Sequence, residues 1–218
     1  MKGVLNMTTP LESRNALLAK TVVSNLEKRH FEAYYCPTAQ EALKKVLDLI
    51  PEGSSIGWGG SMSIRDMGLT KAIHEGNYTV IDRDLAQTPE EAAQMQRDCL
   101  QADYFITSAN AIAEEGIMVN IDGTGNRVAA ICFGPKNVIV VCGINKVTQN
   151  LDAAISRARF VAAPINAGRF DIQTPCKITG KCHNCTSADS ICSEVLITRT
   201  SRPANRVKII LVGEDMGY

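Results

Sequence analysis

The sequence has no excess of charge of either sign, since its 218 residues include 23 lysines and arginines and 23 aspartates and glutamates. This balance argues against a nucleic-acid-binding protein that depends on electrostatic attraction. No apolar run approaches the roughly 20 residues that span a bilayer, so we expect no membrane span. The first ten residues, MKGVLNMTTP, lack the apolar core of a signal peptide, which predicts a cytoplasmic protein.

Cysteine, by contrast, is frequent, with eight in the chain. Because cytoplasmic proteins rarely carry disulfides, metal binding or redox chemistry is the better explanation. Four of the eight lie in PCKITGKCHNCTSADSIC, as Cys176, Cys182, Cys185 and Cys192. Their spacing, C-x5-C-x2-C-x6-C, lets four thiolates converge on one metal centre at little cost in loop-closure entropy. Four cysteine ligands suit a structural zinc or an iron–sulfur cluster, and the spacing does not separate the two.

Strand and helix signals alternate through the first half of the chain. Thr9, Thr38 and Thr88 each precede a glutamate by three residues, and this capping-box pattern predicts that a helix begins after each threonine. Short β-rich runs lie between these helices, at residues 31–35, 54–56, 78–82 and 104–108. The alternation predicts an α/β, Rossmann-like fold with helices on both faces of a parallel or mixed sheet.

The second half has a different pattern. Residues 117–121 and 127–132 flank DGTGN, which predicts a β-hairpin in preference to a phosphate loop, with Asn126 and Arg127 beside the turn as candidates for a nearby site. Further strands are expected at 137–142, 194–198 and 206–212, and a helix at 149–161. We therefore expect an α/β domain over 1–170, with the cysteine-rich segment and final strands at 171–218 packed on the same domain.

The stretch SSIGWGGSMSIRDMGL, residues 54–69, predicts a strand, a glycine-rich turn and a helix start capped by Ser61 or Ser63. Gly57, Gly59 and Gly60 allow backbone N–H groups to approach an anion closely. The spacing matches neither the P-loop nor the dinucleotide-binding fingerprint. A ligand loop and a tight turn with a steric role therefore remain as alternatives.

Three expected strands end in short polar segments: GWGGS after residue 56, SAN after residue 107 and GINK after residue 142. In open α/β sheets, ligands bind at the edge where the carboxyl ends of neighbouring strands meet. Lys146 would supply positive charge there, and Ser61, Ser63, Ser108, Asn110 and Asn145 would supply hydrogen bonds. The sequence thus predicts a site for an anionic small molecule.

Taken together, GWGGSMSIRDMGL, SANAIAEEGIMVNIDGTGNRVAA, FGPKNVIVVCGINK and the cysteine segment resemble the lactate-utilisation (LUD) domain family over nearly the whole chain. The resemblance implies a fold like that of the NagB/RpiA/CoA-transferase group and a link to the oxidation of lactate to pyruvate. It also implies that the four cysteines hold a [4Fe–4S] cluster in preference to zinc.

The leading hypothesis is an iron–sulfur protein that takes part in electron transfer, with a redox partner protein, during oxidation of a small 2-hydroxy acid such as lactate. One alternative is a sugar-phosphate or CoA-ester enzyme with a structural zinc, and another is a non-catalytic assembly subunit. The sequence contains no flavin or nicotinamide fingerprint, so hydride chemistry would reside elsewhere. The sequence allows a homodimer but does not predict one.

Overall fold

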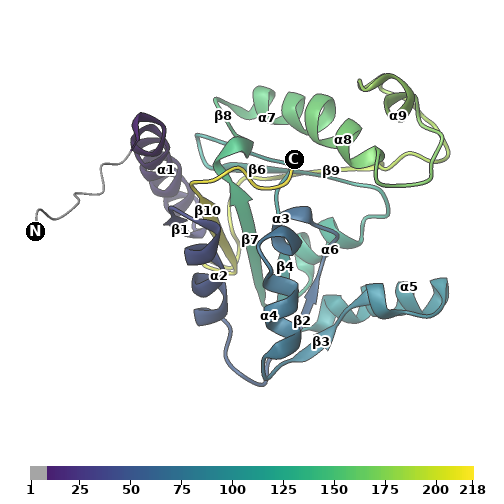
Figure 1. Cartoon of the computed structure of the whole chain (residues 1–218), viewed down its shortest axis with the longest axis horizontal. Helices are drawn as coiled ribbons and strands as arrows, with labels where there is room; N and C mark the ends of the chain where they lie inside the picture. Colours follow the sequence, from purple (N-terminus) through teal and green to yellow (C-terminus); the bar gives the residue numbers. More distant parts are fainter. Residues whose placement is uncertain (1–8) are drawn as a thin grey trace, which may run out of the picture.

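Six parallel strands form the main sheet of the computed structural model, which describes residues 9–218. Their order across the sheet is β1-β10-β7-β4-β2-β3, and every neighbouring pair is parallel (Figure 1). The strands are β1 (Glu32–Cys36), β2 (Ser55–Trp58), β3 (Thr79–Ile81), β4 (Tyr104–Thr107), β7 (Asn137–Gly143) and β10 (Val207–Val212). The α/β fold predicted from the alternating signals is confirmed.

The predicted threonine caps begin three helices. Each threonine side chain accepts a hydrogen bond from the backbone N–H of the glutamate three residues later. This contact satisfies one of the N–H groups that a helix leaves unpaired at its start. The helices that these caps begin are α1 (Pro10–Lys28), α2 (Ala39–Asp48) and α5 (Pro89–Asp98).

Helices cover both faces of the main sheet, as predicted. Along β7, Val138 and Val140 point to the core shared with α1 and with α6 (Asn126–Phe133), whereas Ile139 and Val141 point to the opposite core. That second core is shared with α2, α3 (Met62–Asp66) and α4 (Leu69–Glu75). Alternate residues of a strand face opposite sides, so a strand buried on both faces is apolar throughout.

A second, four-stranded sheet of order β8-β5-β6-β9 lies beside the first. Its strands are β5 (Ala111–Ala113), β6 (Ile117–Asp122), β8 (Val147–Thr148) and β9 (Glu194–Thr198). Helix α7 (Leu151–Arg157) packs on this sheet and continues through a π-helical turn, Ala158–Ala162, into α8 (Ala163–Ala167). The helix expected at 149–161 is therefore longer than predicted, and Figure 1 shows it across the top of the molecule.

The hairpin predicted around DGTGN was wrong, because the residues after the turn form α6 and not a strand. Gly125 adopts φ 79°, a left-handed conformation that glycine accepts readily, immediately before the helix. The Asp122 carboxylate accepts hydrogen bonds from the backbone N–H groups of Arg127 (2.9 Å) and Val128 (3.1 Å). The anion at this helix start is thus supplied by the chain itself.

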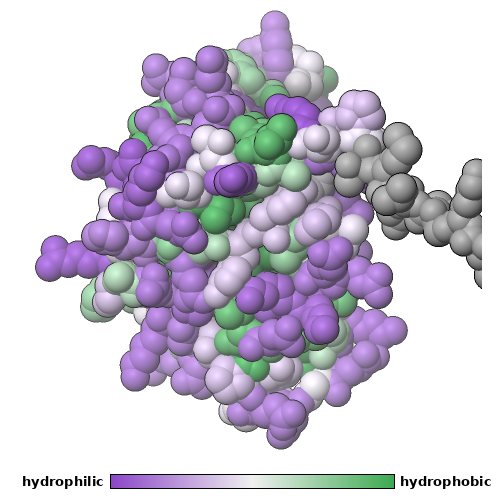
Figure 2. Space-filling model, turned by 90° about the vertical axis from the view of Figure 1, so that its left-hand side faces the viewer, coloured by the Kyte–Doolittle hydropathy of each residue, from purple (hydrophilic) through white to green (hydrophobic). Residues whose placement is uncertain are grey.

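The cysteine-rich segment contains one short helix, α9 (Pro175–Thr179), and leads into β9. The strands on either side of residue 200 join the rest of the fold, since β9 pairs with β6, and β10 lies between β1 and β7. Figure 2 shows the face that carries α1 as mainly hydrophilic, with apolar side chains in small groups.

Within residues 9–218, every helix is too short or too polar to cross a membrane. The prediction about a signal peptide rests mainly on residues 1–8, which lie outside the described residues.

Candidate functional site

A cavity of about 470 Å³ opens at the carboxyl ends of β2, β4 and β7, where the sequence placed a site. These three strands are neighbours in the sheet, so their following segments converge. Ser61 follows β2, Ser108 follows β4, and Lys146 ends the short 3-10 helix after β7. All three side chains line the cavity.

Most of the residues that the sequence predicted for the site line this cavity. Those that do are Gly60, Ser61, Ser63, Ser108, Asn110 and Lys146. Helix α3 begins after Ser61, as one of the two predicted caps, although the Ser61 side chain makes no capping hydrogen bond.

Gly57, Gly59 and Asn145 do not line the cavity. A Cβ atom at Gly57 would lie 2.4 Å from the Cys99 sulfur, and one at Gly59 would lie 2.9 Å from Cδ of Arg127. Both glycines therefore permit close packing under the loop. The Asn145 amide binds the C-terminal segment instead: its Oδ1 accepts from the Met216 N–H at 3.1 Å.

Lys146 lies at the bottom of the site with only 3% of its surface exposed. Its Nζ donates to Oγ of Ser63 at 2.9 Å and to Oγ of Ser108 at 3.0 Å, and the two hydroxyl oxygens lie 3.3 Å apart. Burial, reinforced by the nearby Arg157 and Arg127 guanidinium groups, lowers the pKa of Lys146 to about 8. A fraction of the Lys146 side chains is therefore uncharged near neutral pH.

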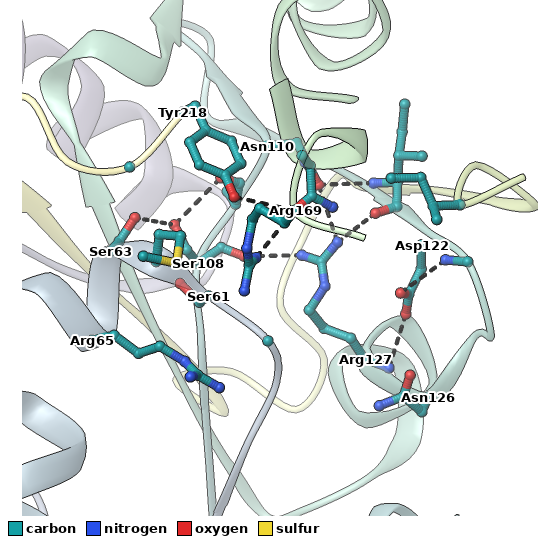
Figure 3. A pocket seen from close by; sticks show the side chains of 18 of the residues that line it. Ser61, Ser63, Arg65, Ser108, Asn110, Asp122, Asn126, Arg127, Arg169 and Tyr218 are labelled. Atoms are coloured by element: carbon teal, nitrogen blue, oxygen red, sulfur yellow. Dashed lines mark hydrogen bonds between the residues drawn. The ribbon is translucent and has the colours of Figure 1, made fainter. Parts of the chain in front are cut away.

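Arg127 crosses from α6 to the base of the cavity and holds three segments together (Figure 3). Its guanidinium donates to the Ser108 carbonyl (3.2 Å), Asn120 Oδ1 (2.8 Å), Asn110 Oδ1 (3.1 Å) and the Ile121 carbonyl. Burial lowers the pKa of Arg127, although Asp122 opposes this shift. Because these donors are committed to the protein, Arg127 sets the position of Ser108 and Asn110.

Three further arginines that the sequence analysis did not single out also line the cavity: Arg65 on α3, Arg83 in the 3-10 helix Arg83–Leu85, and Arg169 after α8. Each comes from a different element, so no local motif marks them. The lining contains five basic residues and two acidic ones, Asp84 and Asp122. Asp84 forms an ion pair with Arg65, and the Asp122 carboxylate accepts hydrogen bonds from backbone N–H groups. The cavity lining is therefore net positive.

Ser61 adds an unused hydrogen-bonding group to the same wall. Its Oγ is buried, and among the described residues it has no hydrogen-bond partner. Buried hydroxyl groups normally have a partner, because an unsatisfied one costs about 1–3 kcal/mol. The orphaned hydroxyl is therefore available to a ligand.

The C-terminal cysteine segment reaches the cavity at Ile191. Ile191 lines the cavity wall, packs close to Gly123 and precedes Cys192 directly. Burial raises the pKa of Cys192 to about 11, and the thiols of Cys176, Cys182 and Cys185 add to the shift.

The donor set of this segment fits a zinc ion or an iron–sulfur cluster in chemical type. Nevertheless, within residues 9–218 the structure contains no group of three or more cysteine, histidine or acidic side chains arranged to hold a metal ion. Between α9 and β9 the segment contains little regular structure.

The structure is similar to a DUF162 family protein from Deinococcus radiodurans, with a TM-score of 0.55, 11% identity, and coverage of 91% of this chain and 98% of that one. A weaker likeness, TM-score 0.35 at 17% identity over 66% of this chain and 57% of the other, is to eIF2B delta from Chaetomium thermophilum and supports no argument.

No curated protein matches the sequence. The LUD domain model, however, matches residues 19–212, which is nearly the whole chain. The matched region includes both sheets, the cavity floor and all four clustered cysteines. The chain therefore belongs to the LUD domain family, which has a role in lactate utilisation.

Proposed function

We propose that this protein binds a small 2-hydroxy or 2-oxo acid, such as lactate, through its carboxylate, and takes part in electron transfer when that acid is oxidised. The observation that supports the proposal is the net positive lining of the cavity, five basic residues against two acids that are already paired. Anionic ligands are attracted to such a site, and its partly enclosed walls strengthen the attraction.

The arginines at the rim are the proposed carboxylate ligands. A guanidinium group offers paired N–H donors that match the two oxygens of a carboxylate. Arg169 donates one hydrogen bond, from NH1 to Asn166 Oδ1 at 3.1 Å, and its remaining donors are available to a ligand. At the floor, the predicted residues Ser61, Asn110 and Lys146 would contact the 2-oxygen of the acid.

For electron transfer we propose a [4Fe–4S] cluster on Cys176, Cys182, Cys185 and Cys192, with a structural zinc as the alternative. A bound cluster would supply one-electron redox chemistry beside the cavity. The contact between Ile191 and Gly123 supports this placement, because Ile191 directly precedes Cys192 and lies against the cavity wall. A redox partner protein would then exchange electrons with the cluster.

Carboxylate binding is tested by isothermal titration of L-lactate into the purified protein at low salt. Arg169→Gln should weaken binding about tenfold, because a hydrogen bond to a charged group contributes about 1.5–3 kcal/mol. Arg199→Gln, which removes an exposed arginine that does not line the cavity, is the control and should bind as the wild type does. Equal affinity in Arg169→Gln and wild type would contradict the assignment of Arg169.

Cluster binding is tested by anaerobic purification, followed by visible absorption and analysis of iron, sulfide and zinc. We expect about four irons per chain, the content of one [4Fe–4S] cluster. Cys185→Ser should lower the iron content, while Cys132→Ser, at an exposed cysteine outside the segment, should not. A colourless wild type with about one zinc per chain would support the structural-zinc alternative.

Lys146→Ala separates the two roles in the same measurement. Because Lys146 lies on the cavity floor and not in the cysteine segment, the variant should keep its metal content while losing affinity for lactate. Loss of metal from Lys146→Ala would show that the cavity and the segment are not independent.

A further inference from the structure

We propose that the cavity floor is a nucleophilic centre for acyl transfer, in which Ser108 Oγ attacks, Lys146 Nζ is the base and Ser63 Oγ positions the lysine. The proposed binding of 2-hydroxy acids uses Lys146 only as a ligand contact and assigns no role to Ser63 or Ser108. A nucleophile and a base within hydrogen-bonding distance, with the base oriented by a third group, is the geometry that serine–lysine catalysis requires.

The three groups form a closed triangle. Lys146 Nζ lies 2.9 Å from Ser63 Oγ and 3.0 Å from Ser108 Oγ, and the hydroxyl oxygens are 3.3 Å apart. The triangle is built from three elements: α3, the end of β4 and the 3-10 helix after β7. All three residues line the cavity, so a ligand can reach them from the open side.

Lys146 lacks the partner that would hold it in the charged form. Among the described residues, no carboxylate forms an ion pair with it. The groups that influence it are Cys142 on β7, Arg157 on α7, Arg127 on α6 and Asp66 at the end of α3, and the two arginines disfavour its charge. With a pKa of about 8, about a tenth of the lysine is neutral at pH 7 and able to accept a proton.

Ser108 is the better nucleophile of the two serines. Both hydroxyl groups also donate to a carbonyl at 3.3 Å, Ser63 to Met216 and Ser108 to Ala109, so exposure separates them, and Ser63 is fully buried. Ser108 retains 5% exposure at the end of β4, and Arg127 holds its backbone through the Ser108 carbonyl. The unpaired Ser61 hydroxyl lines the same cavity and can donate to the oxyanion that forms during attack.

The reaction balances without an oxidant or a metal. Ser108 Oγ forms a bond to the carbonyl carbon of an ester or thioester, while its proton moves to neutral Lys146 Nζ. The bond between that carbon and the leaving group then breaks, and the leaving group takes the proton from Lys146. Water hydrolyses the resulting acyl-serine by the same route and regenerates both groups. The expectation that the acyl group carries a carboxylate rests on the proposed function. The assignment of Ser108 as the nucleophile does not.

The nucleophile is tested with a fluorophosphonate probe, which forms a covalent bond to activated serines and releases fluoride. The wild-type chain should take up one label, located at Ser108 by peptide mass spectrometry, with a rate that rises through pH 8. Ser108→Ala and Lys146→Met should lose the label. Ser24→Ala, at an exposed serine of α1, is the control and should label as the wild type does.

Ser63→Ala tests the positioning role through the pH profile. Removing an acceptor from the charged lysine destabilises that form, so the midpoint of labelling against pH should move to lower pH. A change in rate with an unmoved midpoint would leave Ser63 with a packing role only and overturn this part of the proposal.

Absence of label on Ser108 in natively folded wild type, or equal labelling of Lys146→Met, overturns the proposal. If Lys146→Met does not fold, the wild type decides, since a labelling rate that does not change between about pH 7 and pH 9 also overturns it. Hydrolysis of mono-p-nitrophenyl succinate should exceed that of p-nitrophenyl acetate. If Ser108 is labelled but the succinate ester is not preferred, the proposal that the cavity selects anionic acyl groups is refuted, and the assignment of Ser108 as the nucleophile is not.

Discussion

Replacing Arg127 with methionine should destabilise the protein strongly, because four oxygen atoms each lose one hydrogen bond. The four acceptors are the side-chain oxygens of Asn110 and Asn120 and the carbonyl oxygens of Ser108 and Ile121. Asn110 Oδ1 keeps the hydrogen bond from the Ile121 N–H, and the Ser108 carbonyl keeps the one from Thr107 Oγ1. Asn120 Oδ1 and the Ile121 carbonyl lose the donor that Arg127 supplies, and each acceptor left unsatisfied costs about 1–3 kcal/mol. Release of a buried guanidinium from its desolvation penalty offsets part of this sum. We expect a net loss of about 3–5 kcal/mol, the usual cost of removing one partner of a buried charged network.

Urea unfolding measures this loss directly. With a slope of about 2–3 kcal/mol per molar urea, the midpoint of Arg127→Met should fall by about 1–2 M. Arg199→Met, at an exposed arginine, should change the free energy of unfolding by no more than about 0.5 kcal/mol. A change below about 1 kcal/mol in Arg127→Met would refute the reasoning, because the four hydrogen bonds would then contribute nothing net.

Two further predictions concern the lysine and the glycine loop. The pKa of Lys146 is lower in the folded than in the unfolded chain, so the free energy of unfolding should rise between about pH 8 and about pH 10.5. The raised pKa values of the Cys99 and Cys142 thiols act in the opposite direction. The difference in unfolding free energy between wild type and Lys146→Met, measured in urea at each pH, isolates the contribution of the lysine. Gly57→Ala should lower the melting temperature, because the added Cβ would lie 2.4 Å from the Cys99 sulfur. Cys99→Ala in the same chain should restore part of the loss. If calorimetry shows that the effects of the two substitutions simply add, this contact is contradicted.

The features that the sequence predicted well are those encoded over a few residues. Thr9, Thr38 and Thr88 each begin a helix because the capping hydrogen bond joins residues three apart. The strand expected at 137–142 is β7, whose apolar residues are buried. The meeting of Ser61, Ser108 and Lys146 also followed from the sequence, since parallel neighbours end at the same edge.

The features that the sequence did not predict depend on contacts between distant segments. Helix α6 was missed because its start carries Gly125 where a capping side chain is usual, while the Asp122 carboxylate reaches the helix from before the turn. Arg65, Arg83 and Arg169 come from three separate elements and share no spacing that a local pattern could detect. The rigid role of Arg127 likewise requires knowledge of where β5 and β6 lie.

The central claim, that the cavity recognises the carboxylate of a small 2-hydroxy acid, is tested most directly with a matched pair of ligands. L-lactate and L-lactamide have nearly the same shape, but only lactate carries a negative charge. Isothermal titration should give lactate at least about a tenfold lower dissociation constant, which corresponds to about 1.4 kcal/mol. Equal affinity for the two ligands, or no binding of lactate, would contradict the claim.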